Sequence, residues 1–408
     1  MERVVITGMG AVSPYGIGVE PFINGLKKGH CAVKLMEEWR EIEGLRSHLA
    51  APVDEIDFKK YIKRKFRRNM GRMAMYAAIA AQEAVDHAGL SQNMLSSGKT
   101  GVVMGSTTGS PEFYEQFFSG YLPNKVFDGI KSGTFFKIMS HTCSANVAQM
   151  LSIRGEQWSS CSACASSSQA IGLGMLLIQS GRQEVVICGG ADEVHPMVTA
   201  VFDLVGAASV RNHAPQTTPR PFDKDRDGVV CGEGGGALIL ESLSHAQARG
   251  AHILGELLGF GHSNDCKHIT SPDVEAMMMA MNSALDHAGI KAEDIDFING
   301  HATGTEIGDK AEALAISEVF GNNVLINSFK GHIGHALGAA GVLETIAALD
   351  AFKSHTLMPT LHFKELAPDF PAINVLTEPW KGNINLFLKN SFAFGGVNTS
   401  FVVKRWSN

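Results

Sequence analysis

Two cysteines stand three positions apart in the stretch SSCSACASSSQAIG, which runs from residue 159 to residue 172. This pair, Cys161 and Cys164, fits a dithiol switch, half of a zinc site, or one nucleophile with a bystander. A zinc site needs about four ligands, usually from two paired clusters, and no second Cys-x-x-Cys accompanies this one. A thioredoxin-like switch expects the motif in a small domain, after an N-terminal strand, whereas here it lies mid-chain. The motif therefore favours a single nucleophile.

Cys164 is the better placed of the two sulfurs. The residues before the pair, EQWSS (156–160), read as the end of a strand, and ASSSQAIGLGMLLIQ (165–179) carries a helical pattern. We therefore expect Cys164 at a helix start, where the dipole and the free backbone N–H groups favour a thiolate and can hold a developing oxyanion. Cys161 lies in the approaching segment and is expected to fill a packing position.

A cysteine nucleophile needs histidine partners from elsewhere in the fold, and two settings stand out among the 16 histidines. His301 follows the strand-like run DIDFING, at the carboxyl end where open α/β sheets place functional groups. Lys330, His332 and His335 lie in the glycine-rich segment NSFKGHIGHALGAAG (327–341). The alternative for each histidine is an ordinary turn residue that caps a helix.

Short, branched runs that end at glycine or a small polar residue alternate with helical patterns along the chain. Strands are expected at 3–8, 100–106, 184–190 and 236–241, and again at 294–300, 323–328, 384–391 and 399–406. The clearest helical patterns cover residues 72–90 and 167–181. Strands that alternate with helices predict an α/β fold with helix-covered sheets.

One internal similarity indicates a duplicated unit. The heptapeptides AVDHAGL (84–90) and ALDHAGI (284–290) are nearly identical and lie 200 residues apart. Each ends a helical pattern at glycine, which is a helix stop signal, and each precedes a polar loop and a strand. Two copies of one α/β unit explain this better than coincidence, with a hinge near residues 242–252.

The totals are those of a large compact enzyme. The chain has 408 residues, 45% of them hydrophobic and 19% charged, which allows a sizeable core and two or three domains. No apolar stretch reaches the ~18 residues of a membrane span, and the start MERVVITGMG has no secretory pattern. Seven scattered cysteines then favour reduced thiols in the cytoplasm. The net charge of −6 argues against general nucleic-acid binding.

A basic run stands out against this acidic balance. KKYIKRKFRRNMGR (59–72) holds eight lysines and arginines and no acid. It fits a solvated face, a nucleic-acid patch or a docking site for an acidic partner. Near the N-terminus, GMGAVS (8–13) has serine in place of the third glycine of a dinucleotide-binding fingerprint, so we expect a tight turn there.

Five stretches together resemble one family, the β-ketoacyl-acyl-carrier-protein synthases, elongating ketosynthases of thiolase-like fold. They are SSCSACASSSQAIG, RPFDKDRDGVVCGEGGG, NGHATGTEIGDKAE, KGHIGHALGAAG and NSFAFGGVN, in the family's order and spacing along essentially the whole chain. The resemblance implies a duplicated five-layer αβαβα fold, in agreement with the repeat. It implies an N-terminal half at 1–245 that carries the nucleophile and a C-terminal half at 246–408 that carries both histidines and the phenylalanine gate.

The resemblance also implies roles for single residues. Cys164 becomes the acyl-accepting nucleophile, and His301 and His335 become the two active-site histidines. Lys330 corresponds to the motif lysine and Glu312 to its acidic partner.

Further residues are implied to bind the substrate and its carrier. Phe394, in FAFGG, corresponds to the gate residue whose N–H joins that of Cys164 in the oxyanion hole. Thr303 and Thr305 correspond to contacts with the phosphopantetheine arm, and Phe392 is a further substrate-binding position. The family docks an acidic carrier protein at positions that correspond to Arg64, Lys65 and Arg68.

The implied reaction is a decarboxylative Claisen condensation of an acyl thioester with malonyl-carrier protein, in fatty-acid or type II polyketide or polyene elongation. It implies no metal and no redox cofactor, because the substrates ride on the phosphopantetheine of acyl carrier protein. The implied partners are that carrier and a second subunit, in a homodimer or in a heterodimer with a related ketosynthase-like chain. Departures from the family's pattern at Ala302, Gly304, Glu306 and His332 leave a specialised pathway open beside primary fatty-acid synthesis.

Two rival functions share the fold. A thiolase or another CoA-dependent acyltransferase uses a second cysteine near the C-terminus as base, whereas the last cysteine here is Cys266. A non-catalytic partner subunit lacks the nucleophile, whereas Cys164 is present.

Overall fold

The structure is a computed structural model that describes residues 1–122 and 124–407. Its helices are α1 Val19–Lys27, α2 Arg64–Arg67, α3 Arg72–Ala88, α4 Gln92–Leu95, α5 Pro111–Tyr121, α6 Ser132–Ile138, α7 Thr142–Leu151, α8 Ser166–Gln179, α9 Pro196–Leu204, α10 Leu243–Ala248, α11 Val274–Ala288, α12 Glu306–Phe320, α13 Lys330–Ile333 and α14 Ala340–Ser354. Short 3₁₀ turns are η1 Glu37–Glu41, η2 Phe58–Lys60, η3 Ala163–Ala165, η4 Pro215–Thr217, η5 Ala292–Asp294 and η6 Leu337–Ala339.

The strands are β1 Val4–Ser13, β2 Gly16–Ile17, β3 Lys34–Leu35, β4 Leu49–Ala51, β5 Thr100–Gly105, β6 Gln157–Ser160, β7 Val185–Asp192, β8 Cys231–Gly232, β9 Gly234–Ser242, β10 Gly255–Asn264, β11 Phe297–Asn299, β12 Leu325–Asn327, β13 Thr356–Leu357, β14 Asn374–Val375, β15 Trp380–Lys381, β16 Leu386–Ala393 and β17 Val397–Arg405. The eight strands expected from the sequence are confirmed as β1, β5, β7, β9, β11, β12, β16 and β17. Both expected helices are confirmed as α3 and α8.

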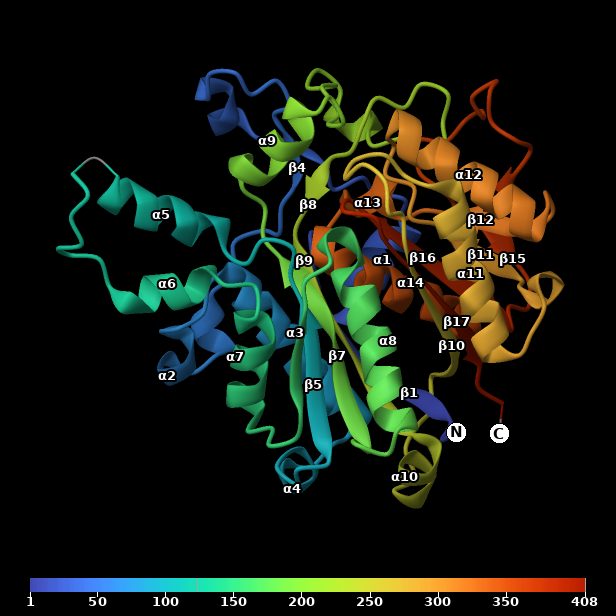
Figure 1. The fold of residues 1–408 in the computed structure, drawn as a ribbon, viewed down its shortest axis with the longest axis horizontal. Coiled ribbons are helices and arrows are strands. Elements are labelled where there is room, and N and C mark those ends of the chain that lie inside the picture. The colour runs from blue at the N-terminus through green and yellow to red at the C-terminus, as the bar shows by residue number, and fades with distance from the viewer. Residues whose placement is uncertain (123, 408) are drawn as a thin grey trace.

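One large sheet runs through the molecule in the order β14-β12-β11-β16-β17-β10-β1-β9-β7-β5-β6 (Figure 1). It consists of two halves with the same pattern. Strands β1, β9, β7, β5 and β6 match β10, β17, β16, β11 and β12, because each series has antiparallel pairs first and parallel pairs at its outer end. The halves meet where β1 pairs antiparallel with β10.

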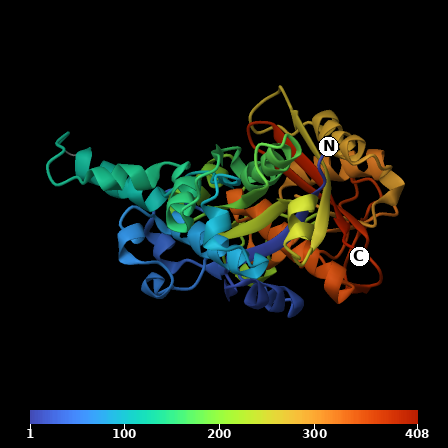
Figure 2. The ribbon, with the colours of Figure 1, turned by 90° about the horizontal axis from the view of Figure 1, so that it is seen from below.

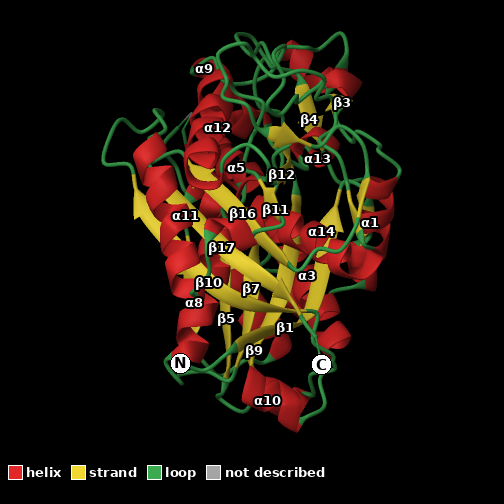
Figure 3. Ribbon diagram, turned by 90° about the vertical axis from the view of Figure 1, so that its right-hand side faces the viewer, coloured by secondary structure: helices red, strands yellow, loops and turns green. Residues whose placement is uncertain are grey.

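Helices divide the fold into five layers, as Figures 1 and 3 allow the reader to follow. Helices α3 and α7 cover the outside of the first half-sheet, and α11 and α12 cover the outside of the second. Helices α8 and α14 contact each other between the two halves. Most of their residues are buried, in keeping with their largely apolar sequences. The expected thiolase-like αβαβα fold is confirmed.

The repeated heptapeptides occupy equivalent places in the two halves. Helices α3 and α11 end at Gly89 and Gly289, with φ of 67° and 66°, a left-handed conformation that favours glycine. His87 accepts a hydrogen bond from the backbone N–H of Met9 in β1, and His287 accepts the matching bond from Phe260 in β10. The duplication predicted from the sequence is therefore present in detail.

The expected tight turn at GMGAVS is wrong, because β1 continues through it to Ser13. The glycines serve close packing instead. A Cβ at Gly10 would lie 2.1 Å from the carbonyl oxygen of Ala80 in α3, and one at Gly261 in β10 would lie 1.9 Å from that of Ala280 in α11. Each glycine lets an outer helix approach the strand at backbone distance.

A helical arm made of α5 and α6 projects from one side of the body, as Figure 2 shows. Its aromatic side chains pack mainly on one another, including Phe117 against Phe127 and Phe135. Several remain exposed to solvent: Phe118, Phe127, Phe135 and Phe136. Among the described residues, no helix is both long and apolar enough to cross a membrane.

Candidate active site

The nucleophile candidate lies on a short turn between a strand and a buried helix. Strand β6 ends at Ser160, and Cys164 follows in the 3₁₀ turn η3, directly before α8. Ala163 takes a φ of +46°, a conformation that a non-glycine residue seldom adopts, and this turns Cys164 inward. Cys164 is only 6% exposed. Cys161 lies exposed outside the turn, so the packing position expected for it is wrong. The expected placement of Cys164 at the start of the helix is therefore confirmed.

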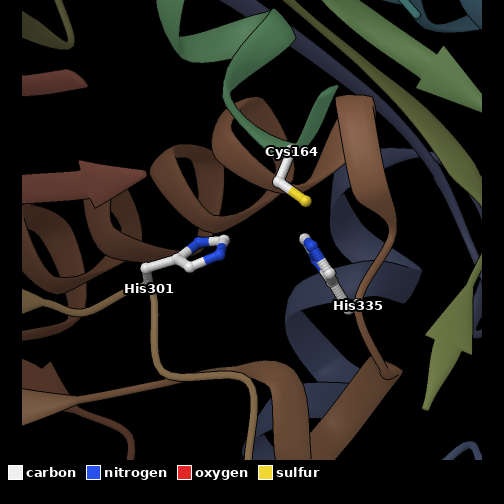
Figure 4. A group of neighbouring side chains, drawn as sticks. All are labelled: Cys164, His301 and His335. Carbon is white, nitrogen blue, oxygen red and sulfur yellow. The ribbon is translucent and has the colours of Figure 1, made fainter. Parts of the chain in front are cut away.

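Two histidines from the second half of the chain face this sulfur, as Figure 4 shows. His301 lies two residues after β11, and His335 lies between α13 and η6. Their rings meet edge to face with centroids 5.2 Å apart. One ligand-type atom from each of Cys164, His301 and His335 lies within 4.8 Å of the other two. Tertiary structure thus brings together three groups that are up to 171 residues apart in the sequence.

Both histidines are held in the neutral form. Burial and then the nearby ammonium group of Lys330 lower the pKa of His301 and His335 well below the ordinary range, and Lys389 adds to the effect. Among the described residues, no hydrogen-bond partner meets Nδ1 of His301 or either ring nitrogen of His335. These nitrogens are free to bind a substrate oxygen.

The same positive surroundings bear on metal binding. A cysteine and two histidines match the donor types of a catalytic zinc site. However, the ammonium groups of Lys330 and Lys389 act on both histidines electrostatically, and like charge disfavours a cation at this place. The arrangement fits a site that stabilises negative charge.

The helix start favours a thiolate at Cys164, as expected, but burial acts more strongly in the opposite direction. Burial raises the pKa of the Cys164 thiol to about 12, and the carboxylate of Asp192 adds to this rise. Lys330 and hydrogen bonding from the backbone N–H groups of Cys164 and Phe394 act in the opposite direction. Desolvation outweighs the helix terminus, so the resting sulfur is a thiol that must lose its proton during the reaction.

The family resemblance implied that Lys330 pairs with Glu312, and this expectation is wrong. The Nζ of Lys330 donates to Oε1 of Glu344 in α14 at 2.7 Å, and both side chains are fully buried. Glu312 instead accepts the backbone N–H groups of His301 at 2.8 Å and Ala302 at 2.6 Å. The physical reason lies in the tertiary structure, because α14 brings Glu344 to Lys330 while Glu312 on α12 is held by the backbone of the His301 loop.

Two phenylalanines of the FAFGG segment flank the three reactive groups. The ring of Phe392 lies edge to face with His301, at a centroid distance of 6.3 Å. Phe394 packs on Phe202 of α9, and its backbone N–H faces the sulfur of Cys164. Two backbone donors, from Cys164 and Phe394, therefore converge on the place where an oxyanion would form.

Thr303 and Thr305 line the approach to the histidines. Their hydroxyl oxygens lie 3.1 Å apart. The buried carboxylate of Asp309 shapes this loop by accepting the backbone N–H groups of Thr303 at 2.9 Å and Gly304 at 3.1 Å. One cavity of about 220 Å³ is lined by Cys164, His301, Thr303, Thr305, Glu312, His335, Phe392 and Phe394.

The basic run is separate from this cavity. Arg64 and Lys65 lie on α2 and Arg68 follows it, and all three side chains are exposed. None of them lines the cavity. Figure 1 places α2 on the side of the molecule that also carries the helical arm.

Three buried charged residues near the site were missed by reasoning from the sequence: Asp309, Glu344 and Lys389. A signal existed for two of them. Glu344 is the only acid in the apolar first part of the helix, AGVLETIAAL, and Lys389 is a lone cation in the buried strand LFLKNSFA. A single charge within an apolar element marks a paired or functional group.

Comparison with known proteins agrees with this geometry. The description "Beta-ketoacyl synthase, N-terminal domain" matches residues 1–246, and "Beta-ketoacyl synthase, C-terminal domain" matches residues 254–364. The chain is 36% identical to the 3-oxoacyl-[acyl-carrier-protein] synthase 1 of Haemophilus influenzae, over 100% of both chains. A β-ketoacyl synthase structure from Burkholderia phymatum has a TM-score of 0.97 and 39% identity, and the ishigamide ketosynthase/chain length factor has 0.93 and 33%, each over 100% of both chains. The chain therefore belongs to the β-ketoacyl synthase family.

Proposed function

We propose that this chain elongates acyl chains by decarboxylative condensation on acyl carrier protein, with Cys164 as the acyl carrier during the reaction. The observation that carries the proposal is the meeting of one thiol, two neutral histidines and two backbone donors in one cavity. The thiol can form a thioester, the histidines can stabilise an enolate, and the backbone donors can stabilise a tetrahedral oxyanion.

In the first stage, the sulfur of Cys164 attacks the carbonyl carbon of an acyl thioester. The carbonyl oxygen becomes negative and accepts hydrogen bonds from the backbone N–H groups of Cys164 and Phe394. The carbon–sulfur bond to the carrier then breaks, and the carrier leaves as a thiol with the proton that Cys164 gave up. The negative charge that forms in this stage lies on the former carbonyl oxygen, next to the two backbone N–H donors.

In the second stage, a malonyl thioester enters and loses CO₂. The electron pair of the broken carbon–carbon bond forms an enolate, whose oxygen accepts hydrogen bonds from His301 and His335. The enolate carbon attacks the thioester on Cys164, so that a carbon–carbon bond forms and the carbon–sulfur bond breaks. One proton taken up from solvent water returns the sulfur to the thiol. The proposed reaction uses no metal and no redox cofactor, because every step is a charge movement between groups that the cavity already provides.

Substrate binding is proposed for the loop that leads to the histidines. Thr303 and Thr305 offer hydroxyl groups along the cavity wall, where a polar phosphopantetheine arm would pass. Phe392 adds an apolar face beside His301. We propose these three residues as contacts with the arm.

Carrier docking is proposed for the exposed basic run around α2. No described acidic side chain forms an ion pair with Arg64, Lys65 or Arg68. Unpaired cations of this kind attract an acidic partner at long range. We propose acyl carrier protein as this partner, because the name of the Haemophilus relative includes it.

A second subunit is proposed from two surfaces. Strand β6 forms the edge of the large sheet, and its Trp158 is 41% exposed. The arm adds exposed aromatic rings, including Phe127, which is 63% exposed. Exposed apolar surface beside an open strand edge indicates association. A homodimer and a heterodimer with a related chain both fit these surfaces. The ishigamide neighbour is named as a ketosynthase/chain length factor, which supports the heterodimer as an alternative.

The rival functions fit the cavity less well. Among the described residues around it, Cys164 is the only cysteine, so a second cysteine base of the thiolase type has no place there. A silent scaffold subunit does not explain a buried thiol that faces two free histidines.

All seven cysteines are free thiols, in keeping with the cytoplasm as the proposed compartment. The proposed division at 245/246 separates the half with Cys164 from the half with the histidines.

The experiment compares two single-cysteine variants. Cys164→Ala is expected to abolish transfer of an acyl group from acyl-carrier protein, measured as the intact mass of the enzyme adduct. Cys161→Ala is the matched control, because its sulfur is exposed and outside the cavity, and it should retain most of the transfer. Equal loss in both variants would falsify the single-nucleophile mechanism. Carriers loaded with acyl chains of graded length in the same assay identify the preferred substrate.

A further inference from the structure

Lys389 occupies a place where lysine is rare. It lies in the middle of β16, with β11 on one side and β17 on the other. Its side chain is fully buried. Among the described residues, Lys330 is the only other lysine that is buried in this way. A buried ammonium group needs a partner of opposite charge to remain charged. The structure supplies one.

The two buried lysines share one carboxylate. Lys330 Nζ lies 2.7 Å from Oε1 of Glu344, and Lys389 Nζ lies 2.7 Å from Oε2. Lys389 also donates a hydrogen bond to the backbone carbonyl of Asn390, which leaves its ammonium group with two further donors for Glu344. Glu312 is the fourth member of the group and interacts electrostatically with both lysines. Two buried cations thus balance two buried anions.

This charged group lies next to the reactive centre. Glu312 holds the backbone of His301, and Asn390, the neighbour of Lys389, donates to the same carboxylate at 3.3 Å. Lys389 acts electrostatically on both His301 and His335, in the same direction as Lys330. The strand that carries Lys389 continues directly into the FAFGG segment.

We propose that Lys389 is a second active-site cation, a positioning residue that fixes Glu344 on Lys330 and adds positive potential where the enolate oxygen forms. This inference rests on the proposed function, because it concerns the decarboxylation stage. It acts through Glu344 and the two histidines and touches no substrate.

The chemical benefit follows from the nature of the intermediate. An enolate is a strong base, and a charged imidazolium beside it would protonate its carbon before it attacked the thioester. Two ammonium groups near His301 and His335 keep both rings neutral, so that they donate hydrogen bonds without delivering a proton. The same two charges stabilise the negative oxygen in surroundings that exclude water.

The inference predicts a pH dependence. The groups that face Lys389 are Glu344 on α14, Lys330 on α13, Glu312 on α12 and the two histidines. Burial outweighs the attraction of Glu344 and lowers the pKa of Lys389 to about 8. The side chain is charged at pH 7 and loses its proton as the pH rises through about 8. Decarboxylation is therefore expected to decline on the alkaline side with a midpoint near that value.

The test variant is Lys389→Met, which removes the charge and nearly keeps the volume. The control is Lys404→Met, which removes an exposed lysine from the neighbouring strand β17. With malonyl-carrier protein, kcat for decarboxylation at pH 7 is expected to fall about ten-fold in Lys389→Met with little change in KM, and the alkaline decline should vanish. Acyl transfer to Cys164 should continue, which distinguishes loss of this effect from loss of the proposed function. The control should behave as the wild type.

Unchanged kcat together with a retained alkaline decline in a folded Lys389→Met variant overturns the inference. Should the variant not fold, the wild-type enzyme still tests it. NMR of ¹³C-labelled lysine side chains follows the titration of Lys389, and decarboxylation must decline with the same midpoint. A wild type that condenses substrates but shows no decline at that midpoint rules out Lys389 as the active-site cation. A wild type that neither transfers nor condenses refutes the proposed function instead.

Discussion

Replacing Glu312 by glutamine tests how the fold holds His301. The carboxylate accepts the backbone N–H groups of His301 and Ala302 with one oxygen each, and it lies fully buried on α12. In Glu312→Gln the size of the side chain is conserved, but only one oxygen remains, and the amide nitrogen then faces a second donor. One N–H group is left without a partner.

The magnitude can be worked out from these contacts. A buried N–H that loses its acceptor costs about 1–3 kcal/mol. Removing one anion from the group of two lysines and two glutamates leaves a buried charge uncompensated, which costs about 3–5 kcal/mol in other proteins. Burial raises the pKa of Glu312, because the carboxylate loses its solvation inside the protein. The neutral glutamine avoids this cost, which offsets part of the loss. We therefore expect the low end of both costs together, a loss of about 4 kcal/mol in the free energy of unfolding.

Activity should fall together with stability. A displacement of His301 by about 1 Å is enough to reduce the rate about 100-fold. The assays are urea unfolding followed by tryptophan fluorescence and decarboxylation of malonyl-carrier protein. Acylation of Cys164 provides an internal comparison, because the backbone donors of the first stage do not depend on Glu312.

The matched control is Glu318→Gln, an exposed glutamate on the same helix α12. It should change neither stability nor rate. If Glu312→Gln lost no more stability than this control and kept full decarboxylation, the two backbone hydrogen bonds would not position His301, and the reasoning would be wrong.

Three further predictions test other parts of the structure. Because the pKa of Cys164 is raised to about 12, its alkylation by iodoacetamide should accelerate about ten-fold per pH unit from pH 7 to 9 without a plateau, and a plateau below pH 8 would reveal a preformed thiolate. Gly10→Ala and Gly261→Ala should each cost about 1–3 kcal/mol in urea unfolding, because each new Cβ meets a helix carbonyl, whereas Gly133→Ala in an open position should not. Lys65→Glu should raise KM for carrier protein at low salt and leave decarboxylation of a small malonyl thioester unchanged, and equal carrier kinetics would place docking elsewhere.

Local sequence determined most of the elements. Branched apolar runs predicted eight of the strands, because strand and helix patterns depend on neighbours along the chain. The glycines after the two repeated heptapeptides predicted the ends of α3 and α11, since only a residue that tolerates positive φ stops a helix in this way. The same reasoning placed Cys164 before α8 and His301 at the carboxyl end of β11.

Reasoning from one stretch at a time was wrong where a distant element decided the outcome. The glycines of GMGAVS resembled a turn, but α3 packs against them and they extend β1. The helix start suggested a thiolate at Cys164, but the walls of the cavity remove water and raise the pKa of the thiol. The residues next to Cys164 in the sequence do not state how completely distant walls exclude water from its sulfur.

The sequence by itself determined the two repeated α/β units, the order of their elements and the residue types that carry the chemistry. Only the tertiary structure decided the charge arrangement behind the histidines, because Glu344 and Lys389 reach Lys330 through the packing of α14 and β16. A buried charge acts over several ångströms in surroundings of low dielectric constant, so its effect depends on distances in space and not on spacing along the chain.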